Sequence, residues 1–95
     1  MATGWMIGVL VEPPGGTAPL RCYFAVGQED RSKAEWTAVD RAMGFGAIAS
    51  SPVDGIEPVQ ALAELSAHMM HAKGLDAGEV RALGSRWPRT WMMKR

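Results

Sequence analysis

The fold is decided by the stretch from Trp5 to Gly27, which reads WMIGVLVEPPGGTAPLRCYFAVG. Apolar residues alternate in both halves of this stretch, which is typical of strands that bury one face. The alternating residues are Ile7, Val9 and Val11 in the first half, and Cys22, Phe24 and Val26 in the second. Because the residues between the halves are rich in Pro and Gly, we predict a β-hairpin of Trp5–Glu12 and Leu20–Gly27.

A helix is predicted directly after this hairpin. Asp30 can cap its first turn, or Ser32 can, in which case Glu35 completes a capping box. The helix should end near Gly44, a residue that can reverse the chain. Its large apolar residues share one stripe, within about 60° of arc at 100° per residue. They are Trp36, Val39 and Met43. We expect this stripe to pack on the hairpin.

The long helix of the chain is predicted over Pro58–Lys73. Pro58 stands where helices often begin, and Gly74 follows the last periodic residue. The residues that recur at helical spacing are Val59, Leu62, Ser66, Met69 and Met70. A third, shorter helix is expected to begin at the cap Asp76, with Glu79 closing a second capping box, and to end at Gly84.

Two short segments have less definite patterns. Ala47–Ala49 could form a third short strand before the turn residues that follow it. Trp91–Met93 could form a last strand at the edge of the sheet, because Pro88 breaks any helix across it.

This order of elements predicts the α+β class, because the strands come first and the helices mostly follow. We expect a small single domain in which the hairpin, with the possible third strand, packs against two main helices and a short third helix. The domain is assigned to residues 1–85. Residues 86–95 form a basic tail that is either docked on the domain or exchanged between protomers.

Composition limits the partners and the cell compartment that we expect for the protein. The chain has 95 residues, of which 47% are hydrophobic and 21% charged, and its formal net charge is zero. Nothing in this balance points to nucleic acid or to a membrane as a partner of the whole chain. A single cysteine excludes an intramolecular disulfide and favours a reducing compartment. We therefore expect a cytoplasmic protein. We also expect no membrane partner, since no apolar run approaches the roughly 20 residues that span a bilayer.

Few residues are candidates for chemistry. Glu64, His68 and His71 would share one stripe of the expected long helix, which makes them a weak candidate for a metal site. The same stripe lies opposite the apolar face, where charged and polar residues are ordinary. Cys22 could act as a nucleophile beside His68 or His71, but it alternates in phase with buried residues, which predicts an inert thiol. We expect no catalytic residue, metal or cofactor.

The tail mixes basic and large apolar side chains. Residues 80–95 contain five basic residues and no acidic one. Such a mixture suits a protein interface, and it also suits stacking on unpaired bases with contacts to phosphates. A third reading folds Trp87 and Trp91 back to close a small core. The candidate interaction residues are Arg86, Trp87, Arg89, Trp91, Met92 and Lys94.

Three functions remain open at this stage. The first is a non-enzymatic interaction protein that forms a homo-oligomer, expected to be a dimer, and acts through its tail or a sheet edge, with a protein partner as a further option. The second is nucleic-acid binding through the basic, Trp-bearing tail. The third is a small-molecule binding domain or enzyme whose site lies at a dimer interface.

Overall fold

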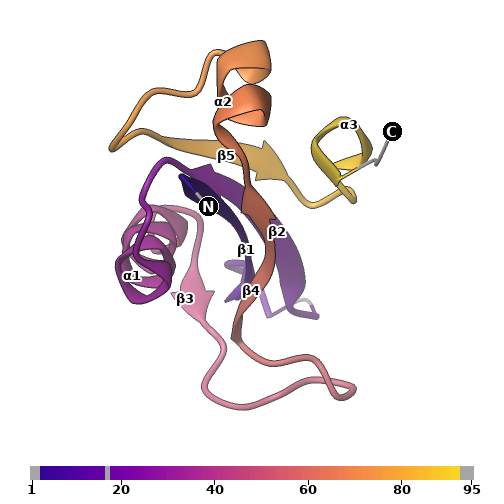
Figure 1. Cartoon of the computed structure of the whole chain (residues 1–95). Helices are drawn as coiled ribbons and strands as arrows, with labels where there is room; N and C mark the ends of the chain where they lie inside the picture. Colours follow the sequence, from indigo (N-terminus) through magenta and orange to yellow (C-terminus); the bar gives the residue numbers. More distant parts are fainter. Residues whose placement is uncertain (1–2, 17, 93–95) are drawn as a thin grey trace.

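The computed structural model describes residues 3–16 and 18–92, and it contains a single sheet with helices on both sides (Figure 1). The strands are β1 (Gly4–Glu12), β2 (Leu20–Val26), β3 (Ala47–Ile48), β4 (Val59–Leu65) and β5 (Val80–Gly84). The helices are α1 (Arg31–Ala42), α2 (Ala67–Lys73) and α3 (Arg89–Met92). The α+β class and the N-terminal hairpin are confirmed.

β1 lies at the centre of the sheet, and every pairing is antiparallel. β2 pairs along one side of β1, with Trp5 opposite Val26 and Val11 opposite Leu20. The other side of β1 is shared by β4 and, beyond it, by the short β3. β5 adds to the outer side of β2. β4 and β5 are therefore the long outer strands, and the expected third strand is confirmed at Ala47–Ile48.

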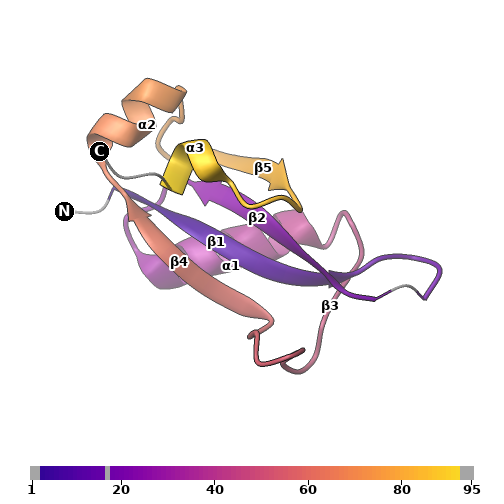
Figure 2. The same cartoon turned by 90° about the vertical axis from the view of Figure 1, so that its right-hand side faces the viewer.

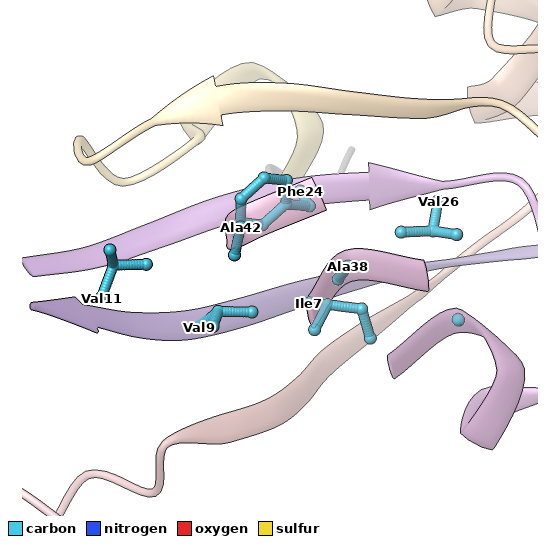
Figure 3. Packing of buried hydrophobic residues seen from close by; sticks show 8 residues of the cluster. Ile7, Val9, Val11, Phe24, Val26, Ala38 and Ala42 are labelled. Atoms are coloured by element: carbon cyan, nitrogen blue, oxygen red, sulfur yellow. The ribbon is translucent and has the colours of Figure 1, made fainter. Parts of the chain in front are cut away.

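One face of the sheet, the α1 face, packs against α1 (Figure 2). The side chains of β1 and β2 that point to this face meet small side chains of the helix (Figure 3). The fully buried helix residues are Ala34, Ala38 and Ala42. Alanine lets the helix approach the strands closely, so the larger side chains of the sheet fill the space between them.

The predicted orientation of α1 is therefore wrong. The start of the helix is as expected, because the Asp30 side chain accepts a hydrogen bond of 3.1 Å from the backbone N–H of Lys33. The stripe of Trp36, Val39 and Met43, however, does not pack on the hairpin. It lies away from the alanine stripe, and Trp36 and Met43 are exposed.

The opposite face of the sheet, the α2/α3 face, carries a second apolar cluster. Its buried members are Met6, Tyr23, Ala25, Leu65, Met70, Leu75 and Trp91. They come from the hairpin, from the end of β4, and from the two short helices with the turn after α2. Alternate residues of β1 and β2 thus point to opposite clusters, as their alternating pattern predicts.

The predicted helix over Pro58–Lys73 is wrong in its first half. Val59–Leu65 is the strand β4, and α2 begins only after Ser66, whose hydroxyl accepts a 3.1 Å hydrogen bond from the N–H of Met69. The segment 59–65 fits a strand as well as a helix, because its apolar residues also alternate. The strand forms because β1 would otherwise have an unpaired side. Pairing with residues 59–65 satisfies the backbone N–H and C=O groups of this central strand.

The short helix expected after Asp76 is also wrong. The Glu79 carboxylate does accept a 2.9 Å hydrogen bond from the N–H of Asp76, as a capping box would have it. The chain then reverses at Gly78, whose φ is 82°, and continues as β5. The hydrogen bond from Asp76, helped by the Arg81 guanidinium, lowers the pKa of Glu79.

The expected strand at Trp91–Met93 is a helical turn instead. α3 follows Pro88, whose carbonyl accepts 3.1 Å hydrogen bonds from the N–H groups of Trp91 and Met92. Proline is favoured at the start of a helix, where its missing N–H costs nothing. Met93 lies outside the described residues, and the division into residues 1–85 and a tail stays a prediction.

Candidate functional site

The outer side of α1 exposes the largest apolar side chains of the helix. Trp36 is 70% exposed and Met43 is 56% exposed, and half-buried Val39 lies on the same stripe. We call Trp36, Val39 and Met43 the α1 patch. A tryptophan this exposed gains little from folding of the single chain, so the patch is a candidate contact surface.

A groove adjoins the patch where α1 passes the outer strands of the sheet. It has a volume of about 360 Å³ and is lined by Trp36 and Val39 from the helix, with Ile48 of β3 and Val59 of β4. Of the described residues at its wall, Glu35 is the one that carries a charge. The groove could accept a flat apolar side chain from outside the chain.

Two opposite charges lie along the same stripe as Trp36. Lys33 and Asp40 are exposed, and they stand three residues before and four residues after the tryptophan. Such spacing places all three on one side of a helix. Among the described residues the ion pairs are Arg31–Glu35 and Glu79–Arg81, so Lys33 and Asp40 take part in neither.

A second surface lies on the α2/α3 face, around Tyr23. Trp87 is 50% exposed and meets the Tyr23 ring edge-on, with 5.7 Å between the ring centroids. The Arg21 guanidinium lies 5.7 Å from the same centroid and donates a hydrogen bond to the Gln60 side chain. Gly8 leaves room for it, because a Cβ there would lie 2.9 Å from Arg21 Nε.

The other predicted tail residues differ in burial. Trp91 is buried in the second cluster, with Lys73 Nζ 5.5 Å from its ring centroid. Met92 is half-buried at the edge of that cluster, whereas Arg86 and Arg89 are exposed. Lys94 lies outside the described residues.

The structure separates the candidate metal ligands. Glu64 lies on β4, whereas His68 and His71 lie on α2, so the single helical stripe that suggested the site does not exist. Within residues 3–16 and 18–92, no three His, Cys, Asp or Glu side chains form a group that could hold a metal ion. The same residues include no helix long and apolar enough to cross a membrane.

Cys22 faces α1 at the side of the first cluster and is half-buried. Burial raises the pKa of its thiol, so the thiolate that a nucleophile needs is disfavoured. No described base is hydrogen-bonded to it.

The geometry of the described residues thus offers surfaces for contact with other molecules. Comparison of the chain with protein-family models, with curated proteins and with solved structures gave no match.

Sequence reasoning missed the α1 patch, although a signal for it was present. The alanines at positions 34, 38 and 42 recur every four residues and form an apolar stripe of their own. A helix with two apolar stripes has one that the sheet does not cover. Side-chain size, which favoured the stripe of Trp36 as the buried one, was misleading because close packing on the sheet requires small residues.

Proposed function

We propose that this protein is a small, non-enzymatic interaction protein that forms a homodimer through the α1 patch. The observation that carries the proposal is the orientation of α1, which buries its alanines and turns Trp36 and Met43 outward. Exposed tryptophans are frequent hot spots of protein interfaces. The single cysteine supports the cytoplasm as the place where the protein acts.

The flanking charges favour a second copy as the occupant of this surface. If two α1 helices lie antiparallel about a two-fold axis between positions 36 and 37, Lys33 of each copy stands opposite Asp40 of the other. The same arrangement brings the two Trp36 side chains together at the axis, where each can cover the groove of the other copy. An isologous contact needs such self-complementarity.

The size of the patch predicts a weak dimer. α1 has 12 residues and is therefore about 18 Å long, so one helix contact covers less than the roughly 800 Å² per partner of a standard interface. We expect a concentration-dependent equilibrium between monomer and dimer.

The outer strands are less suited to self-association than the patch. β4 has a bulge opposite Met6 and Ile7, and β5 has one opposite Tyr23 and Phe24. In each case an extra leucine, Leu62 or Leu83, joins the α2/α3 face. Bulges in outer strands hinder the regular pairing that would extend a sheet into a second copy.

Light scattering over a concentration series tests the proposal. The mass of the natural protein should rise from monomer toward dimer, and Trp36→Ala should shift that rise to higher concentration. Trp87→Ala is the matched control, because it removes an exposed tryptophan outside the patch. Asp40→Lys should weaken the dimer, and adding Lys33→Asp should restore it.

The proposal fails if the natural protein remains a monomer at the highest concentration reached. It also fails if Trp87→Ala weakens the dimer and Trp36→Ala does not, which would point to the surface around Tyr23.

That second surface supports an alternative function, the binding of single-stranded nucleic acid. Trp87 presents half of its indole to solvent and shares the Tyr23 ring with the Arg21 guanidinium. Arg86 and Arg89, one and two residues away in sequence, are exposed. Arg21 has no carboxylate partner among the ion pairs of the described residues, and its Nε is buried without a hydrogen bond. Bases could stack on Trp87 while phosphates meet the arginines.

Fluorescence anisotropy with a labelled oligothymidine tests this alternative. Affinity should fall steeply with salt, Arg86→Ala with Arg89→Ala should flatten that dependence, and Trp87→Ala should cost about 1–3 kcal/mol of binding free energy. Arg31→Ala on α1 is the control. Absence of binding at low salt would exclude the alternative.

A further inference from the structure

A small cavity lies on the α1 face, at the end of the sheet where α1 finishes. It has a volume of about 200 Å³. Phe24 of β2 and Phe45, in the segment after α1, lie on its wall, with 6.2 Å between their ring centroids. Cys22 of β2 also lines it, and so does Ala82 of the neighbouring strand β5. The cavity is separate from the groove beside Trp36 and shares no residue with it.

The chemistry of the lining excludes a charged occupant. Among the described residues, no Asp, Glu, Lys, Arg or His lines the cavity, and Ser85 provides the one hydroxyl there. The Cys22 thiol is neutral, because burial raises its pKa. A charge placed here would lose its hydration without a partner.

The volume limits the size of the occupant. An apolar cavity of about 150 Å³ is enough to bind benzene, whereas pockets for drug-sized ligands begin near roughly 300 Å³. About 200 Å³ therefore accommodates one ring with a small substituent, and not a nucleoside or a long acyl chain.

Phe45 forms a partly exposed part of the cavity wall. Its ring is 46% exposed, it lies between Gly44 and Gly46, and the guanidinium carbon of Arg41 lies 5.6 Å from its centroid. An aromatic ligand entering beside it would contact both phenylalanine rings, and aromatic pairs gain energy beyond the area that they bury. From the volume, the lining and these two rings, we infer that the cavity is a binding site for a small uncharged aromatic molecule.

Cys22 provides a direct readout, because it is the single cysteine of the chain and lines the cavity. Toluene is the probe, and the rate of Cys22 modification by 5,5′-dithiobis(2-nitrobenzoate) is measured. At a toluene concentration ten times its Kd the modification should slow about tenfold, because roughly one molecule in eleven is then free. Benzoate, a ring of similar size with a charge, should give no protection.

Ala82→Leu should fill the cavity and abolish the protection by toluene, whereas Ala72→Leu on the exposed side of α2 should retain it. If Ala82→Leu does not fold, amide chemical shifts of the natural protein decide. Toluene should then move the signals of residues 22, 45 and 82 and leave that of Trp36 in place. Trp36→Ala should show the same protection, which separates this site from the proposed dimer.

Three outcomes would overturn the inference. Toluene at its solubility limit could leave the modification rate unchanged, benzoate could protect equally well, or the shifts could gather around Trp36 instead of Cys22.

Discussion

Single glycines decide where the chain can turn against the sheet. Gly27, directly after β2, donates a 2.8 Å hydrogen bond to the Glu79 carbonyl and accepts one of 2.6 Å from the N–H of Gly78. These bonds hold the turn before β5 against the end of the hairpin. A Cβ at Gly27 would collide with the backbone carbonyl of Asp76, which cannot move without breaking the turn.

Gly27→Ala should therefore lower the free energy of unfolding by about 1–3 kcal/mol, the usual cost of forcing an extra carbon into a tight space. Urea unfolding followed by circular dichroism measures the change. Gly44→Ala is the control, because a Cβ there meets its nearest atom at 3.3 Å, at the end of α1. Equal stability of the two variants would show that the turn does not depend on Gly27.

At the scale of elements, the hairpin and the start of α1 were predictable because their signals are local. Alternation along β1 and β2 and the cap at Asp30 depend on residues close in sequence. α2 lies within the predicted helix and ends at Gly74 as expected, whereas the strands β4 and β5 were not predictable in this way. Residues 59–65 become a strand because β1 has a free side with which they can pair. The capped turn at Asp76 leads into the strand β5, and not into a helix, because Gly78 reverses the chain.

The orientation of α1 can be tested by enlarging a residue of its alanine stripe and, in a separate variant, by truncating a residue of its Trp36 stripe. Ala38 is fully buried against the sheet, so Ala38→Leu should destabilise the protein by about 1–3 kcal/mol through overpacking. Trp36→Ala, on the outward stripe of the same helix, should change the free energy of unfolding of the monomer by no more than about 0.5 kcal/mol. Urea unfolding at low concentration measures both, and the opposite order would mean that the Trp36 stripe faces the sheet.

For the molecule as a whole, the end of the described chain belongs to the core. A domain of this size buries a modest share of its surface, so one large side chain matters to its total stability of about 5–15 kcal/mol. Trp91 is such a side chain, packed in the second cluster on the α2/α3 face. Trp87, four residues earlier, is half exposed and contacts the Tyr23 ring.

Trp91→Ala should cost about 3–5 kcal/mol of unfolding free energy, the usual range for a buried tryptophan. Trp91→Phe should cost less, and Trp87→Ala should cost less than Trp91→Ala because its indole is half exposed. Thermal unfolding of the three variants gives the order. A Trp91→Ala protein as stable as the natural one would mean that the α2/α3 cluster does not need this helix.

The sequence by itself determined the hairpin, the cap at Asp30 and the face to which Cys22 points, because each follows from neighbours within a few residues. It also determined the α+β class, through the order of the expected elements. It also located the tryptophans and arginines near the C-terminus. Only the tertiary structure decided that residues 59–65 pair with β1, that alanines cover the sheet, and that Trp36 faces outward. These outcomes depend on which surfaces meet after the chain has folded. The local patterns, such as the alternation over residues 59–65 and the alanine spacing of α1, are each compatible with more than one outcome.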